Sequence, residues 1–260
     1  MELRGLGEGN DADAMVRQVL DSGDFAVVFQ PVVDLATSEV AGYEALTRFS
    51  DGRPPNLWFA EAHQCGLGVD LELAALEKAL AALPEQPPGF LSLNISAATL
   101  RSSALLRRLA GSLPGAVVLE LIGHGPLGDP DTARARIAGL RQLGVQVALD
   151  NVGSGPASLR PAVDLQPDLI KIDRSLVSYV DRDPVQRAVV GAFAQLAMSL
   201  GWVVVAEGIE REQELAVCAD LGIALGQGYL LGRPAPMPGQ RQPEHPWVAW
   251  TEEIWQAANS

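Results

Sequence analysis

Short apolar runs alternate along the chain with longer segments of helical spacing. The runs are rich in β-branched residues and predict buried strands at 25–33, 40–46, 90–95, 116–122, 145–149, 169–172, 202–206 and 223–231. Repeated strand–helix alternation indicates an α/β fold with a largely parallel sheet, and a closed (β/α)8 barrel is the simplest arrangement. An open, doubly wound sheet is the structural alternative.

The segments between the runs carry recognisable helix ends. Asp183 and Pro184 suit the start of one helix, and Gly201 suits its end. Asp129 suits the start of a second helix, and Asp70 precedes a third helix at 71–83. One apolar stripe at three- and four-residue steps is predicted to face the core, and it consists of Val185, Ala188, Val189, Ala192, Phe193, Leu196 and Leu200.

Composition and charge narrow the class of protein. The chain is 48% hydrophobic and 20% charged, which is typical of a globular protein. Its net charge of -13 argues against a broad basic surface for DNA or RNA. An anionic ligand would therefore need metal ions or a few well-placed arginines.

Cysteine usage and hydropathy bear on location. Cys65 and Cys218 form neither a disulfide framework nor a zinc-binding spacing, which fits a reducing compartment. No apolar run reaches the length of a membrane span, and the first residues lack the apolar region of a signal peptide. The expectation is a cytoplasmic protein without a membrane partner.

Polar residues follow the predicted strands at the ends where barrel enzymes hold their active sites. These residues are Glu44, Asn94, Glu120, Asp150, Lys171, Glu207 and Gln227. Several carboxylates cannot stay ionised together in a cleft without cations. Because the set offers oxygen ligands, it suits Mg²⁺, Mn²⁺ or Ca²⁺, and these ions suit phosphoryl chemistry.

A series of motifs resembles the EAL domain family of cyclic di-GMP phosphodiesterases. The stretch FQPVVDLATSEVAGYEALTRF is followed in order by LNIS, LEL, LDNVGSG, PDLIKID, VVAEGIE and GQGYLLGRP. The resemblance covers residues 13–236, which leaves a lead-in at 1–12 and a Trp-rich tail at 237–260. It implies a modified TIM barrel whose first strand runs antiparallel to the others.

The same resemblance implies roles for individual residues. The implied metal ligands are Glu44, Asn94, Glu120, Asp150 and Asn151; the implied catalytic residues are Glu44, Lys171 and Glu207; and the implied cyclic di-GMP surface is Gln30, Leu46, Arg48, Asn94 and Gln227. The implied cofactor is Mg²⁺ or Mn²⁺, with Ca²⁺ as an inhibitory ion. The implied reaction is in-line attack of metal-bound hydroxide on one phosphodiester, which yields pGpG.

Two departures from the family pattern predict weak turnover. Asn151 stands where the family has a second aspartate, and Gly123 stands where it has a second glutamate that supports the loop after Asp150. Four carboxylates and Lys171 then carry a charge of -3, where five carboxylates and the lysine of the family pattern carry -4. Loss of an outer support is typically a 10–100-fold effect on metal affinity or activity.

Three functional interpretations follow from this sequence. The first is a phosphodiesterase of low activity, the second is an inactive cyclic di-GMP receptor, and the third is a protein-interaction module that uses the tryptophans of the tail. A monomer and a homodimer are both compatible with the pattern.

Overall fold

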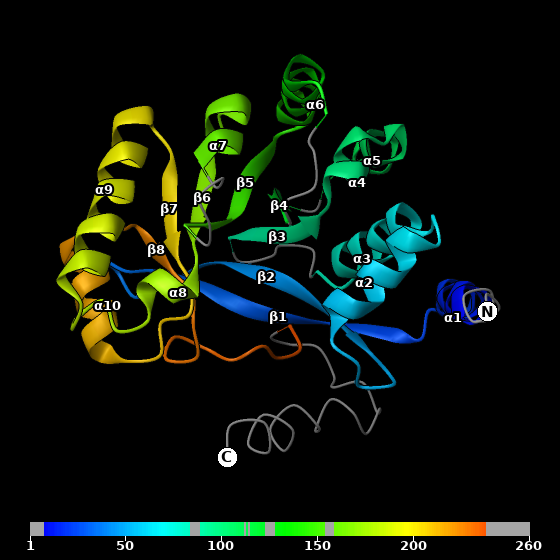
Figure 1. Ribbon diagram of the computed structural model, residues 1–260, viewed down its shortest axis with the longest axis horizontal. Coiled ribbons are helices and arrows are strands. Elements are labelled where there is room, and N and C mark those ends of the chain that lie inside the picture. The colour runs from blue at the N-terminus through cyan, green and yellow to red at the C-terminus, as the bar shows by residue number, and fades with distance from the viewer. Residues whose placement is uncertain are drawn as a thin grey trace, which may run out of the picture.

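Eight strands close into one barrel in the computed structural model, which describes residues 8–83, 89–111, 113, 115–122, 128–153 and 159–237 (Figure 1). The barrel follows chain order from the first strand to the eighth. The strands are β1 (Phe25–Asp34), β2 (Val40–Phe49), β3 (Phe90–Ile95), β4 (Ala116–Leu121), β5 (Val145–Val152), β6 (Leu169–Ile172), β7 (Val203–Ala206) and β8 (Leu225–Gly226). Closure excludes the open-sheet alternative.

The first strand has the opposite direction to its neighbours. Strand β1 pairs antiparallel with both β2 and β8, whereas every other neighbouring pair is parallel. A short turn at residues 35–39 joins β1 to β2, and a connection this short permits only an antiparallel pair. The expected EAL-type barrel is therefore confirmed.

Helices surround the barrel (Figure 1). They are α1 (Glu8–Ser22), α2 (Pro55–Gln64), α3 (Gly68–Ala81), α4 (Ala97–Arg101), α5 (Ser103–Leu109), α6 (Pro130–Gln142), α7 (Leu159–Leu165), α8 (Arg174–Val177), α9 (Pro184–Leu200) and α10 (Glu212–Asp220). Asp129 and Asp183 cap α6 and α9 as predicted, and Gly201 ends α9 with φ 73°. Asp70 does not cap α3, because that helix already begins at Gly68.

The barrel interior holds an apolar plug. One side chain from each of six strands forms a buried cluster, and Ala41 and Phe90 from the remaining two strands pack against it; the six are Val32, Val118, Ala148, Leu169, Val205 and Leu225. Because side chains alternate between the two faces of a strand, the residue two positions along from each member also points inward.

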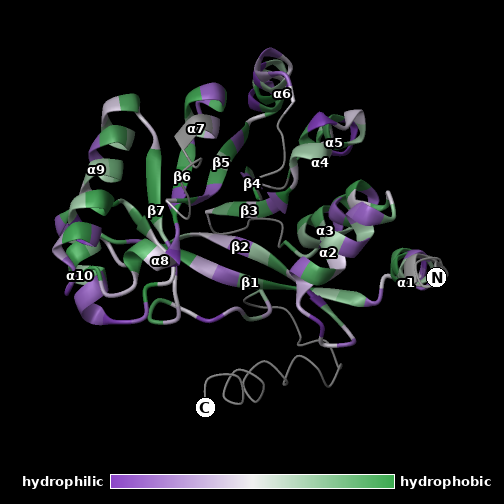
Figure 2. Cartoon of the chain, in the orientation of Figure 1, coloured by the Kyte–Doolittle hydropathy of each residue, from purple (hydrophilic) through white to green (hydrophobic). Residues whose placement is uncertain are grey.

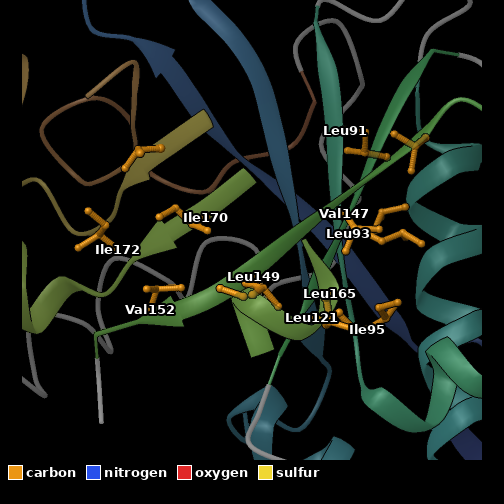
Figure 3. Packing of buried hydrophobic residues seen from close by; sticks show 14 of the residues in the cluster. Leu91, Leu93, Ile95, Leu121, Val147, Leu149, Val152, Leu165, Ile170 and Ile172 are labelled. Atoms are coloured by element: carbon orange, nitrogen blue, oxygen red, sulfur yellow. The ribbon is translucent and has the colours of Figure 1, made fainter. Parts of the chain in front are cut away.

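Outward-facing side chains of the strands make the main core with the helices. Leu91, Leu93 and Ile95 of β3 alternate with the inward residues and pack with their counterparts on β4, β5 and β6 (Figure 3). A second cluster joins α1, α2 and α3 to the far end of the β1–β2 hairpin through Phe25, Phe49 and Trp58 among others. Helix α1 crosses the boundary predicted between the lead-in and the domain.

The predicted core stripe of α9 is wrong except at Phe193, which is partly buried and packs against the main core. Val185 is 69% exposed, and Val189 and Leu196 are also exposed, whereas Val190, Ala194 and Ala197 are buried. The helix is apolar on both faces, so the periodic pattern did not distinguish the face against the barrel from the outer face (Figure 2).

Adjacent valines on α9 provide a test of this orientation. Val190→Ala removes fully buried methyl groups and is expected to lower the free energy of unfolding by about 2 kcal/mol. Val189→Ala changes an exposed side chain and is expected to stay within about 0.5 kcal/mol of the parent. Urea denaturation of the two variants measures both values, and equal losses would contradict the orientation of the helix.

Some predicted features lie outside the described residues. These are Gly123 and residues 238–260, which include Trp247, Trp250 and Trp255 of the Trp-rich tail. Among the helices that are described, none is long and apolar enough to cross a membrane.

Candidate active site

A layer of polar side chains lies directly above the apolar plug. Each plug residue is two positions from a polar residue on the same strand or on its extension, and the resulting pairs are Val32 with Gln30, Val118 with Glu120, Ala148 with Asp150, Leu169 with Lys171, Val205 with Glu207 and Leu225 with Gln227. Glu44 and Asn94 complete the layer from β2 and β3. The strand pattern therefore brings the predicted site residues to one mouth of the barrel.

Lys171 lies at the centre of this layer. Its Nζ is 3.0 Å from Glu44 Oε2, 2.7 Å from Glu120 Oε2 and 2.8 Å from Glu207 Oε1. The lysine is 2% exposed, so these three ion pairs replace the hydration of its charge. An ammonium group has three N–H donors, and the three carboxylates use all of them.

Amide side chains hold Glu44 from two sides. Asn94 Nδ2 donates to Glu44 Oε1 at 2.8 Å, and Gln227 Nε2 donates to Glu44 Oε2 at 2.8 Å. Gln227 Nε2 also lies 3.1 Å from Gln30 Oε1, and Gln30 Nε2 donates to the carbonyl of Gly232. Gln30, predicted to contact the ligand, thus contributes to the wall of the site.

Sequence reasoning did not identify Ser92. This residue is 1% exposed on β3, and its hydroxyl donates to Glu120 Oε1. The signal was present in the sequence, since Ser92 precedes Asn94 by two positions and must point inward with it. Ser92 therefore orients Glu120 within the polar layer.

Burial and mutual repulsion shift the pKa values of the carboxyl groups. Burial, followed by the charge of Glu44, raises the pKa of Glu120 to about 8, and burial raises that of Glu207 to about 7. Burial also works to raise the pKa of Glu44, but Lys171 and the two amides bring it below its usual value. Although burial opposes it, the surrounding carboxylates raise the pKa of Lys171, so the lysine stays protonated.

Asn151 differs from the other members of the site in its backbone. Its φ is 56°, a left-handed conformation that Asn adopts more readily than most residues. Its Nδ2 donates to Asp150 Oδ2 at 2.6 Å. Burial raises the pKa of Asp150. The amide thus occupies one oxygen of a predicted metal ligand.

The donor chemistry fits a divalent cation. Four carboxylates and one lysine give the layer a formal charge of -3, and Gln227 Oε1 is buried without a hydrogen-bond partner. Within the described ranges, no three His, Cys, Asp or Glu side chains are grouped so that they could already hold a metal ion. Lys171 instead gathers three of the acids.

A cavity of about 580 Å³ opens beside the polar layer, between the β2–β3 wall and helices α2, α3 and α4. Leu46, Arg48 and Asn94 line it, so three of the five residues predicted to bind cyclic di-GMP border this space, and Asn94 is also a predicted metal ligand. Arg48 Nη1 donates to the carbonyl of Thr47. Burial lowers the pKa of Arg48.

Comparison with known proteins identifies the family. The EAL domain model matches residues 13–234, which span the whole barrel. The chain belongs to the EAL domain family. The cyclic di-GMP phosphodiesterase RocR of Pseudomonas aeruginosa is 29% identical over 233 residues, which cover 84% of this chain and 59% of RocR.

Solved EAL structures resemble this barrel closely. The EAL enzyme Bd1971, in a form with cAMP and cyclic di-GMP bound, is 25% identical with a TM-score of 0.81, and the match covers 90% of this chain and 68% of that one. Klebsiella pneumoniae BlrP1, in a manganese and cyclic di-GMP complex, is 28% identical with a TM-score of 0.72, and the match covers 81% and 56%.

Other relatives are much longer than this EAL domain. The chain spans 28%, 29% and 39% of the lengths of three of them, from Sinorhizobium fredii, Caulobacter vibrioides and Mycobacterium bovis. The family match therefore describes the barrel alone. The activity of the whole protein is a proposal.

Proposed function

We propose that this EAL domain binds cyclic di-GMP at a divalent-metal site and hydrolyses it slowly to pGpG. The observation that carries the proposal is the polar layer, in which four acids and two amides surround a single lysine. Because this layer is negatively charged and oxygen-rich, a phosphodiester could approach it only with cations present.

The proposed ligands of the first metal are Glu44, Asn94, Glu120 and Asp150. Mg²⁺ or Mn²⁺ is the proposed ion, with Ca²⁺ as an ion that binds without supporting turnover. Asn151 offers a neutral oxygen to a second ion. When bound, such ions neutralise phosphate charge and make water a stronger acid.

The protein side chains have separate tasks in the proposed reaction. Lys171 remains protonated and fixes the oxygens of Glu44, Glu120 and Glu207 relative to one another. The guanidinium of Arg48 presents a fork of donors that matches a phosphate. Leu46 supplies apolar contact for the ligand at the rim of the 580 Å³ cavity.

A receptor without turnover is the second candidate, and one contact favours it. Asn151 donates to Asp150, so the position after Asp150 holds that acid where the family pattern has a further carboxylate. A protein with this feature would retain the first metal and Arg48 while losing catalytic efficiency. A cytoplasmic location and homodimer formation accompany either candidate as proposals.

Calorimetric titration with cyclic di-GMP tests the binding part of the proposal. We expect binding in Ca²⁺ and none after removal of divalent ions with EDTA, because the polar layer would then repel the phosphates. Failure to bind in Ca²⁺, Mn²⁺ and Mg²⁺ would exclude both candidates and leave a protein-interaction role.

Arg48→Ala tests the phosphate contact. A hydrogen-bonded charged pair contributes about 1.5–3 kcal/mol, so the dissociation constant for cyclic di-GMP should rise by about 10–100-fold. Arg101→Ala is the matched control, since Arg101 lines the same cavity but lies on α4. Equal losses in the two variants would indicate a general effect of positive charge and would contradict a specific role for Arg48.

A further inference from the structure

Glu72 is a buried acid that lies outside the polar layer. It belongs to α3 and is 3% exposed. Its Oε2 accepts the backbone N–H of Ser96 at 2.8 Å, and its Oε1 lies 2.6 Å from His63 Nε2. One side chain therefore connects the end of α2, the body of α3 and the point where β3 leaves the barrel.

Gly68 makes the contact between His63 and Glu72 possible. A Cβ atom at position 68 would overlap the imidazole ring of His63, so the ring packs against bare backbone. Gly68 is the first residue of α3, where any side chain would have to displace the ring. The glycine thus allows the His63–Glu72 pair.

The junction after β3 connects Glu72 to the active site. Ser96 caps α4 by accepting the N–H of Thr99 through its side chain at 3.2 Å. Asn94 lies two residues before Ser96, and its side chain donates to Glu44. Ile95 between them is fully buried, so the backbone at this junction has little freedom to shift.

We propose that Glu72 is a positioning residue for the EAL site: with His63, it fixes the β3–α4 junction so that Asn94 meets Glu44. Glu72 lines the 580 Å³ cavity, and it acts on the metal ligands through the Ser96 backbone. The proposal rests on the proposed function, in which Asn94 and Glu44 hold the first metal.

Calorimetry with Mn²⁺ and the rate of pGpG formation test this role in three variants. Glu72→Leu leaves the Ser96 N–H without an acceptor, and we expect Mn²⁺ affinity to fall by about 10–100-fold, as for other outer supports of metal sites. Glu72→Gln keeps an oxygen for that N–H and should stay close to the parent. Gly68→Ala displaces His63, and we expect a loss of Mn²⁺ affinity between those of the other two variants, even though alanine favours helix.

Asp168 provides a matched control at the opposite end of the barrel. Its carboxylate also accepts a backbone N–H, from Val147 at 2.8 Å, and also pairs with a basic side chain, Arg141 at 3.1 Å. Asp168→Leu should lower the melting temperature without a change in Mn²⁺ affinity. An equal loss of affinity in this variant would mean that lower stability alone explains Glu72→Leu, and it would overturn the proposal.

A spectroscopic readout separates this inference from the proposed function. In metal-free protein, the NMR resonances of the Asn94 side-chain amide report its hydrogen bond to Glu44. We expect them to shift in Glu72→Leu and Gly68→Ala but not in Asp168→Leu. If the parent bound neither Mn²⁺ nor cyclic di-GMP, the proposed function would fail while these resonances still decided the positioning role. Unchanged resonances in Glu72→Leu and Gly68→Ala would refute it.

Discussion

Lys171→Met is expected to lower the free energy of unfolding by about 3–5 kcal/mol at pH 8, and by much less at pH 5. Lys171 is the cation at the centre of two buried carboxylates, Glu44 and Glu120, and the partly buried carboxylate of Glu207. Its loss leaves their charges uncompensated within the barrel mouth. Urea denaturation in buffers without divalent ions measures the effect.

The direction of the pH dependence follows from the carboxyl groups. Burial already raises the pKa of Glu120 to about 8 and that of Glu207 to about 7 with Lys171 present. Removal of the lysine raises both further above their unfolded values. The folded variant then binds protons that the unfolded chain releases, so its stability falls as the pH rises from about 5 to about 8.

Lys78→Met is the control for the loss of a lysine. Lys78 donates to the backbone carbonyls of Gly23 and Phe25 and forms no ion pair with a carboxylate among the described contacts. We expect its replacement to lower the free energy of unfolding, but this loss should not grow from pH 5 to pH 8 as it does in Lys171→Met. A pH-independent loss in Lys171→Met would contradict the electrostatic account of the polar layer.

Asn151→Asp is expected to raise the rate of pGpG formation by about 10–100-fold at saturating Mn²⁺. The change removes the amide that donates to Asp150 and adds a carboxylate beside it. Both effects favour a second metal ion. The left-handed backbone at this position is no obstacle, because Asp also tolerates it.

Asn151→Gly and Gly123→Glu complete this test. Glycine adopts the φ of 56° without strain but offers no side-chain ligand, so Asn151→Gly should show no gain. Gly123→Glu alone should give a limited gain in the rate of pGpG formation. The gain of the double variant with Asn151→Asp should exceed the product of the two single gains, because both changes act on the second metal and the loop that holds it. Rapid turnover by the parent protein, or no gain in the double variant, would refute this explanation of low activity.

Burial explains why much of this fold could be predicted from the sequence. The runs at 90–95 and 169–172 match β3 and β6 because strands covered on both faces are short and continuously apolar. The run at 223–231 does not match β8, since that strand contains only Leu225 and Gly226; residues 223–224 precede it, and residues 227–231 form the loop that begins at Gln227. Apolarity alone could not separate that loop from a strand.

Side-chain geometry sets the limit for the site. The polar residues at strand ends could be predicted because barrel topology brings them together, and the structure gathers Glu44, Glu120 and Glu207 on Lys171. The role of Glu72 could not be predicted from the sequence, because it depends on a contact between α3 and the β3–α4 junction. No periodicity in the chain encodes such a contact.

The formation of pGpG from cyclic di-GMP, followed by chromatography with and without Mn²⁺, is the most direct test of the proposed function. We predict slow, Mn²⁺-dependent formation by the parent protein and none by Glu44→Gln, since Glu44 contacts Lys171, Asn94 and Gln227 at the centre of the site. Product formation that persists unchanged in Glu44→Gln, or that does not require a divalent ion, would contradict the account.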